Sequence, residues 1–430
     1  MTDALDRAVA RARRRLVPFL LLMYVLAFLD RTNIGFAKDA FQVSAGISTT
    51  AYAFGAGIFF LAYAALGVPS NLILHRVGAR LWMCLMMVTW GIVAGGTMFV
   101  SGDLSFYLAR VLLGAAEAGF FPGVILYVTY WFPRRDRGQI LGLFYFGAPL
   151  SFIFGSPLSG MLLELHGFLG LEGWKWMFLI EGLLASAVGV WAWFYLQDRP
   201  GAGVHWLAED EKAALTAALD AEARLIEAEG VKDVSAAFRN SRVWQFVSIY
   251  FLIQASVYGV IFFLPTQVAA LLGVKVGLEV GFVTAIPWIC ALAATFYLPR
   301  LADRTNRHRS LAVLTLAVSG LGIAVSAASG PAVALVALCF AAAGFIAVQP
   351  IFWTFPTSYL GGTAAAAGIA LINSVGGLGG FVAPNIKAWA DAWLGAPAGL
   401  YALAATTLVG AAGIFFLRRP PAAVTPPSAL

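Results

Sequence analysis

The amino-acid sequence predicts an all-α polytopic membrane protein whose twelve transmembrane helices form two pseudo-symmetric halves of six. The 430-residue chain is 60% hydrophobic and only 12% charged, about half the charged fraction of a soluble domain. Apolar runs of about 20 residues, long enough to cross a bilayer, recur along the chain. These runs lack the alternation of barrel strands, so helices are expected to satisfy the backbone hydrogen bonds.

The apolar runs place the spans. The predicted ranges are 16–37, 50–74, 81–101, 104–131, 138–163, 174–196, 242–271, 278–300, 309–328, 331–356, 364–390 and 396–418. The polar interval between the sixth and seventh spans includes 204–229, which predicts an amphipathic helix. Its apolar stripe consists of Leu207, Leu215, Leu219 and Ile226. The predicted organisation is therefore a basic N-terminal tail (1–15), a first bundle (16–196), a cytoplasmic linker (197–241), a second bundle (242–418) and a C-terminal tail (419–430).

The basic residues predict the orientation. With the N-terminus inside, 22 of the 28 basic residues fall in intracellular segments, four fall outside, and Arg31 and Arg110 lie within spans. Cytoplasmic segments of membrane proteins carry the excess of Lys and Arg. We therefore expect a multi-pass protein of the cell (inner) membrane with both termini in the cytoplasm.

Several classes of function are disfavoured. The cysteines Cys84, Cys290 and Cys339 lie singly in apolar runs, which predicts neither a disulfide framework nor a metal site. No Walker motif or basic soluble domain is visible, so neither ATP nor nucleic acid is expected as a partner. An intramembrane enzyme would need a nucleophile and base or a metal cluster at depth. A non-transporting sensor or scaffold would not need to retain buried charges.

A marker sequence occurs after the second span of each half, at 71–80 and again at 299–308. Such an internal duplication is typical of secondary transporters. The marker is similar to the cytoplasmic-loop motif of the major facilitator superfamily, Gly-x-Leu-Ala-Asp-Arg-x-Gly-Arg-Arg. The second copy keeps Leu-Ala-Asp-Arg and has Asn306 at the later glycine, whereas the first copy has His75 at the acid. Inter-half ion pairs and helix-end contacts are predicted for Arg76, Gly78, Arg80, Asp303, Arg304 and Arg307.

Other stretches narrow the resemblance to the anion:cation symporter family of that superfamily. They are Leu-Asp-Arg-Thr-Asn (29–33), Val-Pro-Ser-Asn-Leu (68–72), Leu-Gly-Ala-Ala-Glu-Ala-Gly-Phe-Phe-Pro-Gly (113–123), Tyr-Trp-Phe-Pro (130–133) and Phe-Leu-Ile-Glu-Gly (178–182). Members of this family import organic acids with protons. The resemblance implies a monomeric transporter that needs no cofactor.

Charged residues at membrane depth usually mark a substrate or ion pathway. At 1.5 Å per residue, Arg31 lies about 22 Å from the start of its span, and Arg110 about 9 Å from the opposite surface. In a core about 30 Å thick, both lie at a similar depth. A guanidinium can form bidentate hydrogen bonds with a carboxylate. The two arginines could therefore bind one carboxylate each, or the two ends of one substrate. The alternative for Arg110 is that it snorkels to the surface.

Glu117 follows Arg110 by two helical turns, within a run of small residues. Burial disfavours the ionised form of a carboxylate, which makes Glu117 a candidate proton carrier. The resemblance implies proton coupling for Asp30 and Glu117, and substrate binding for Arg31 and Arg110. Alternatively, Asp30 only neutralises Arg31, and Glu117 pairs with a neighbouring helix. Glu181 is expected to cap or pack the sixth span near its outer end.

The C-terminal half has no charge at that depth and is expected to supply neutral contacts. The predicted substrate-binding set, besides the arginines, is Asn33, Tyr63, Gln254, Tyr258, Trp353 and Asn373, with Tyr63, Trp353 and Asn373 supported by the resemblance. Bends are predicted near Pro265 and near Gly376. Phe120, Phe121, Tyr145 and Phe146 could form an aromatic wall.

The sequence thus predicts a secondary transporter that imports a small organic carboxylate with protons by alternating access. Its expected partners are the organic anion, H⁺ and the lipid bilayer. A sugar acid or a hydroxy-dicarboxylate such as tartrate fits two arginines and polar groups. An aromatic acid such as phthalate or hydroxyphenylacetate fits the aromatic wall, and an uncoupled or exchange mode of anion transport is the other alternative.

Overall fold

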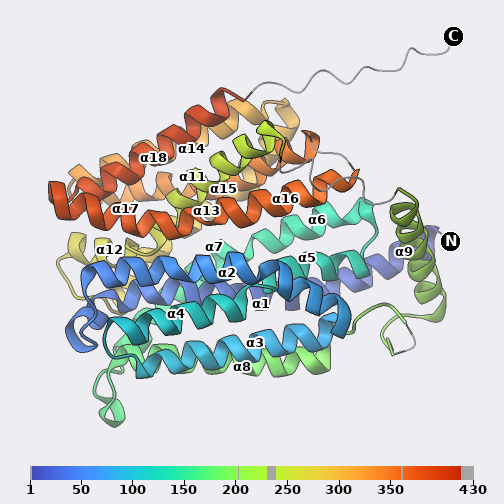
Figure 1. The fold of residues 1–430 in the computed structure, drawn as a ribbon, viewed down its shortest axis with the longest axis horizontal. Coiled ribbons are helices and arrows are strands. Elements are labelled where there is room, and N and C mark those ends of the chain that lie inside the picture. Colours follow the sequence, from blue (N-terminus) through green and yellow to red (C-terminus); the bar gives the residue numbers. More distant parts are fainter. Residues whose placement is uncertain (1, 202, 230–238, 360–361, 418–430) are drawn as a thin grey trace.

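A computed structural model describes residues 2–201, 203–229, 239–359 and 362–417 (Figure 1). Within these ranges the regular elements are α-helices and two short 3-10 turns, with no β-strand. The predicted all-helical fold is confirmed. The predicted C-terminal tail, 419–430, lies outside the described residues.

Each predicted span corresponds to one helix or to two helices in line. In the N-terminal half these are α1 (Thr2–Ser44), α2 (Thr49–Val77), α3 (Ala79–Gly96), α4 with α5 (Asp103–Glu117, Phe120–Trp131), α6 with α7 (Arg134–Tyr145, Gly147–Leu163) and α8 (Gly173–Tyr195). After α9 (Glu209–Glu229), the C-terminal half contains α11 with α12 (Ser241–Ile261, Leu264–Leu272), α13 (Leu278–Thr305), α14 (His308–Ala328), α15 (Pro331–Tyr359), α16 with α17 (Gly362–Gly377, Gly379–Leu394) and α18 (Ala398–Phe415).

Four spans are interrupted where two helices meet. The breaks follow Glu117, Tyr145, Ile261 and Gly377, and the last two confirm the bends predicted near Pro265 and Gly376. Eleven of the predicted spans are long and apolar enough, within the described residues, to cross a membrane. The exception is the span made of α16 and α17, whose two helices have 16 residues each.

The N-terminal tail and the linker differ from their predicted boundaries. Helix α1 already begins at Thr2, so the basic tail is the first part of a 43-residue helix. Helix α9 begins at Glu209 instead of 204, because acidic residues fill its first turn and Glu211 accepts a hydrogen bond from the backbone N–H of Ala208 at 3.1 Å. Leu207 therefore precedes the helix, although it is buried. The side chain of Ile226 lies outside the described residues.

Two ends of the bundle can be distinguished in Figure 1. We call the end that carries the N-terminus and α9 the linker end, and the opposite end the far end. Ion pairs attach α9 to the N-terminal half: Arg11 to Glu211 at 3.0 Å and Arg137 to Glu222 at 2.8 Å. Helix α9 and the N-terminal half therefore form one unit.

The two halves meet in a tight seam near the far end. Helix α7 packs on α13, α2 on α17, and α1 on α12. The approach is close enough that a Cβ added to Gly160 would lie 2.5 Å from the Gly277 carbonyl oxygen. The Tyr52 hydroxyl reaches across and donates to the Phe262 carbonyl at 3.0 Å. Backbone contact of this kind, which small residues permit, closes the far end.

The duplicated marker makes contacts within each half in this conformation, and the inter-half ion pairs predicted for it stay a prediction. No ion pair among the described residues joins the halves, because the helices converge at the opposite end. In the first copy, Gly78 has φ +94° and the Arg80 backbone N–H donates to Asp198 at 2.8 Å. In the second copy, Asp303 pairs with His308 at 2.8 Å. Arg76, Arg304 and Arg307 belong to the ends of α2, α13 and α14.

Asn306, which occupies the position of the second glycine in the motif, has a backbone conformation that is usual for glycine. Asn306 has φ +52° and ends α13 with hydrogen bonds back to Ala302 and Asp303. Asparagine is the residue that best substitutes for glycine in such a left-handed cap.

Gly281→Ala should weaken closure at the far end. The added Cβ would lie 2.5 Å from the Ser156 carbonyl oxygen and 3.0 Å from Pro157 Cα, and overpacking of this kind costs about 1–3 kcal/mol. Since these contacts are to backbone, the halves must separate there. The measurement is the labelling rate of a cysteine introduced at Thr266 in a cysteine-free background, which should rise about five- to a hundredfold.

The control for this experiment is Gly142→Ala. Nothing lies within 4 Å of a Cβ at Gly142 in α6, and alanine is the better helix former. Its labelling rate should equal that of the parent. Equal rates for both variants would show that the seam does not hold the far end closed.

Candidate functional site

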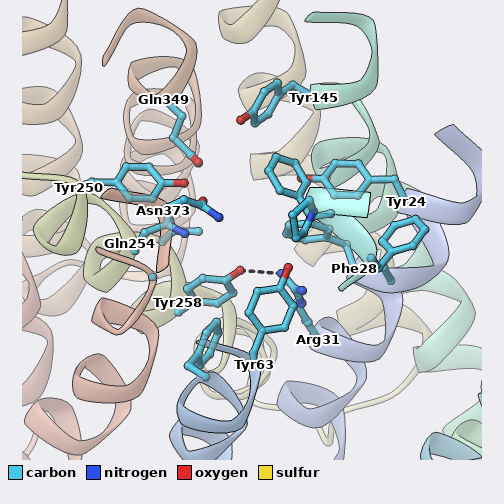
Figure 2. A pocket seen from close by; sticks show the side chains of 18 of the residues that line it. Tyr24, Phe28, Arg31, Tyr63, Tyr145, Tyr250, Gln254, Tyr258, Gln349 and Asn373 are labelled. Atoms are coloured by element: carbon cyan, nitrogen blue, oxygen red, sulfur yellow. Dashed lines mark hydrogen bonds between the residues drawn. The ribbon is translucent and has the colours of Figure 1, made fainter. Parts of the chain in front are cut away.

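A cavity of about 170 Å³ lies between the two halves, on the linker-end side of the seam. Helices α1, α2, α5, α6 and α7 line it from one half, and α11, α13, α15 and α16 from the other (Figure 2). This volume is below the range of roughly 300–1,000 Å³ that is usual for drug-sized ligands. The cavity is therefore suited to a compact molecule.

The two walls of the cavity differ in chemistry. The N-terminal half contributes mainly aromatic side chains: Tyr24, Phe28, Phe60, Tyr63, Phe120, Phe121 and Tyr145. The C-terminal half contributes hydrogen-bonding groups: Tyr250, Gln254, Tyr258, Thr295, Gln349, Asn373 and Ser374. Figure 2 shows Gln254, Gln349 and Asn373 on one side and Tyr24 and Phe28 on the other. A ligand with an apolar and a polar face could contact both.

Arg31 is the charged residue among the described residues that line the cavity. Its Nη1 donates to the Tyr258 hydroxyl at 3.0 Å, across the two halves, and its Nη2 pairs with Glu117 Oε2 at 3.2 Å. The rings of Phe28, Phe59 and Tyr63 lie 4.7, 5.3 and 5.3 Å from the guanidinium carbon. Arg31 Nε has no hydrogen-bond partner among the described residues. The guanidinium is thus held by one carboxylate and still has donor capacity.

Asp30 does not pair with Arg31, although the two are adjacent in sequence. Successive helical residues point about 100° apart, and Arg31 turns toward Glu117 while Asp30 is buried, 2% exposed, beside Asn33. Among the described residues, Asp30 forms no ion pair. The geometry therefore does not support the reading in which Asp30 is the counter-ion of Arg31.

Arg110 lies outside the cavity lining. It is 3% exposed, and it donates to the backbone carbonyls of Gly55 and Ala56 in α2 at 3.3 and 3.4 Å. Its guanidinium carbon is 4.8 Å from the Phe59 ring, which also contacts Arg31. Arg110 consequently neither snorkels to the surface nor faces the cavity with Arg31.

Glu117 is the last residue of α4 and lies behind Arg31. It is 1% exposed, with one oxygen on Arg31 and the other, Oε1, without a partner among the described residues. The helix breaks directly after it, and α5 begins at Phe120. The break positions the aromatic pair Phe120 and Phe121 at the cavity.

The other predicted binding residues divide into two groups. Tyr63, Gln254, Tyr258 and Asn373 line the cavity, and Gln254 Oε1 is buried without a partner among the described residues. Trp353 does not line it; its ring packs on Tyr250 with 5.0 Å between centroids. Asn33 is also outside the lining and donates to Glu181 Oε2 at 3.0 Å. Of the predicted aromatic wall, Phe146 lies elsewhere, near Phe296.

Several lining residues were missed by the sequence analysis. Gln349 precedes a proline inside an apolar run, a signal that could have identified it. Tyr24, Tyr250 and Thr295 carry no such signal among the many tyrosines and threonines. Glu181, expected to cap or pack near a helix end, instead lies in the third turn of α8 and is 1% exposed. It bonds to Asn33 of α1 and Ser159 of α7.

The comparisons with known proteins agree with this architecture. The pattern that describes the Major Facilitator Superfamily matches residues 20–384. The chain belongs to the Major Facilitator Superfamily. Among solved structures, the xylose transporter XylE from Escherichia coli, in a partially occluded inward-open conformation, has a TM-score of 0.74 at 15% identity, covering 94% of this chain and 97% of that one. At this identity the likeness concerns the fold alone.

Two relatives within the superfamily align over nearly the full chain. The inner membrane transport protein RhmT of Escherichia coli (strain K12) is 51% identical over 418 residues, covering 97% of this chain and 96% of that protein. A protein of Agrobacterium vitis, provisionally named a tartrate transporter, is 44% identical over 421 residues, covering 97% and 96%. The chain is therefore a membrane transporter of this superfamily and not an enzyme.

Proposed function

We propose that this superfamily member imports a small organic carboxylate together with protons, by alternating access of its two halves. The observation that carries the proposal is the ion pair between Arg31 and Glu117 at the wall of the inter-half cavity. Arg31 would bind the carboxylate of the substrate, and Glu117 would bind the proton.

The coupling follows from charge. A guanidinium that already holds an ionised Glu117 is neutralised, so a second carboxylate on Arg31 would leave the buried site with an excess negative charge. Two carboxylates about 6 Å apart repel by about 2–3 kcal/mol at an effective dielectric constant of about 20. Protonation of Glu117 removes this repulsion. By linkage, the anion and the proton should each strengthen the binding of the other by about 30- to 150-fold.

The orientation of the proposed cycle rests on the distribution of basic residues. If the linker end is cytoplasmic, as the excess of Arg and Lys predicts, the seam closes the outer side and the cavity lies on the cytoplasmic side of it. The conformation would then be inward-facing. Release of the anion into the cytoplasm would restore the bond between Arg31 and Tyr258, which ties the halves together.

The cavity supports a substrate with one carboxylate and several hydroxyl groups, that is, a sugar acid. Arg31 supplies the one guanidinium of the described lining, and Arg110 faces α2 instead. Gln254, Gln349 and Asn373 could bond to hydroxyls on the opposite side. A hydroxy-dicarboxylate such as tartrate has a second carboxylate, which could form hydrogen bonds only with neutral donors of the described lining. The name of the Agrobacterium vitis relative keeps tartrate among the candidates.

An aromatic carboxylate is the second candidate. The rings of Tyr24, Phe121, Tyr145 and Tyr250 line the same cavity as Arg31. Stacking on such rings contributes about 0.5–1.5 kcal/mol per ring pair. A phthalate- or hydroxyphenylacetate-like acid could therefore lie along this wall with its carboxylate on Arg31.

Uptake into proteoliposomes with an acidic exterior tests the proposal. A panel of sugar acids, tartrate and phthalate should contain an acid that accumulates at least tenfold when a pH gradient is imposed. Dissipation of the gradient with a protonophore should abolish this accumulation. Transport that is insensitive to the gradient for every acid would overturn proton coupling, and would support an uncoupled or exchange mode.

A further inference from the structure

A buried polar cluster lies beside the Arg31–Glu117 pair and does not line the cavity. It consists of Asp30 and Asn33 of α1, Ser159 of α7 and Glu181 of α8, and each of these residues is at most 2% exposed. All three helices belong to the N-terminal half. The cluster contains two carboxylates, whereas Arg31 points away from it.

The hydrogen bonds of the cluster meet at one amide. Asn33 Nδ2 lies 3.0 Å from Glu181 Oε2 and 3.5 Å from Asp30 Oδ1. Ser159 Oγ lies 2.8 Å from Glu181 Oε1. Asp30 Oδ2 and Asn33 Oδ1 are buried acceptors without a hydrogen-bond partner among the described residues. Two neighbouring acceptors therefore lack a donor within the described part of the chain.

The charged groups around the cluster leave both acids without a direct counter-ion. Within the described residues, Arg31 is paired with Glu117, and Arg110 donates to backbone carbonyls of α2. Helix α3 faces α8 through Gly91 and Gly95, and α7 contributes the neutral Ser159. Ionisation of both Asp30 and Glu181 would place two negative charges around one amide in an apolar surrounding, which is strongly unfavourable.

We propose that Asp30 and Glu181 form a second proton-binding site, in which the two carboxylates hold one proton between them and the Asn33 amide donates to both. Either acid could hold the proton. On Glu181 Oε1 it would be donated to Ser159, whose hydroxyl can accept as well as donate. On Asp30 Oδ2 it would remove the charge of a buried carboxylate oxygen that has no hydrogen-bond donor among the described residues. This inference rests on the proposed function, because it assigns a second site to the same proton coupling.

The site would act on substrate binding through its place in α1. Asp30 is the backbone neighbour of Arg31, so loss of the shared proton adds a negative charge near the guanidinium that binds the substrate. Because its four residues belong to one half, the site would move with that half during the transport cycle. A proton taken up while the far end is open could then be carried across with the substrate.

The test uses proteoliposomes and an acid that the wild type accumulates. The pH profile of uptake and the number of protons per substrate are measured for wild type, Glu181→Gln, Asp30→Asn and the double variant. Removal of one acid takes away a neighbouring negative charge, so the other holds its proton less tightly. The alkaline limb of the profile is the pH range in which uptake falls as the pH rises. Each single variant should therefore shift this limb to lower pH by about one unit. The double variant should lose this limb and about one proton per substrate.

Two further variants separate the proton site from a purely structural role. Ser159→Ala removes a hydrogen bond but no acid, so its alkaline limb should not shift to lower pH, and it should keep the wild-type number of protons per substrate. Glu181→Asp keeps an acid and should do the same. Substrate exchange, which moves no net proton, should persist in Glu181→Gln and shows that the variant is folded. If Glu181→Gln does not fold, the proposal is decided by comparing the pH profile of Asp30→Asn with that of Ser159→Ala.

The outcomes distinguish this inference from the proposed function. A wild type without any proton dependence would overturn the proposed function, and this inference with it. A proton-coupled wild type whose profile is unchanged in both Glu181→Gln and Asp30→Asn would overturn the shared site alone. Shifts in both single variants and no limb in the double variant would support it.

Discussion

Arg31→Lys should raise the dissociation constant of the transported acid at least about 30-fold, although the positive charge is kept. An ammonium lacks the planar fork that bonds to Tyr258, Glu117 and a substrate carboxylate at once. Loss of one charge-assisted hydrogen bond corresponds to about 2 kcal/mol. Binding to purified protein by calorimetry, together with the KM of uptake, measures the effect.

Two other arginines provide controls for this variant. Arg300→Lys changes an exposed residue whose Nη1 donates to the Phe296 carbonyl, and binding should be unaffected. Arg110→Lys alters a buried arginine that does not line the cavity, so its cost should appear mainly in thermal stability. If Arg31→Lys binds as wild type does, or if folded Arg110→Lys loses as much affinity, the assignment of Arg31 as the substrate-binding arginine is wrong.

Glu117→Gln should lose the part of the proton-driven accumulation that Glu117 couples, about a hundredfold, while exchange of substrate across the membrane continues. Glutamine resembles the protonated acid in shape and charge, but it cannot release a proton. Arg31 would then be free of its ionised partner at every pH. We therefore also expect the KM of the variant to rise less steeply with pH between about 6 and 8 than that of the wild type, because only the shared site of Asp30 and Glu181 would still titrate.

The matched control is Glu279→Gln, which changes an exposed acid in the first turn of α13. It should accumulate substrate as wild type does. Accumulation at the wild-type level by Glu117→Gln, with exchange also normal, would remove Glu117 from the coupling mechanism. The proton would then have to be carried elsewhere in the buried cluster.

The fold was predictable because its determinants are local or repeated. Apolar length defines each span, and the second copy of the marker indicates that the arrangement of the first half is repeated. The breaks near Pro265 and Gly376 followed from residues that disturb a helix. The start of α1 was missed, because a basic amphipathic segment can continue a membrane helix without any break in its backbone.

The candidate site was only partly predictable. The sequence gives the depth of a residue in the membrane, but it does not say which side of its helix the side chain faces in the folded protein. The depths of Arg31 and Arg110 suggested two guanidiniums facing one substrate, yet packing against α2 turns Arg110 to the Gly55 carbonyl. Adjacency in sequence likewise suggested a pair between Asp30 and Arg31. The partners of Glu181 come from two other helices, and only the tertiary structure brings them together.

The broken spans have a consequence for how such a protein can change during evolution. Residues next to three of the breaks, Ala118, Tyr145 and Gly377, line the cavity, so the course of the main chain defines much of its outline. The seam at the far end is likewise made largely by main-chain atoms. New specificity could therefore arise from exchanges at positions such as Gln349 or Tyr145, while the machinery that opens and closes the protein is inherited unchanged.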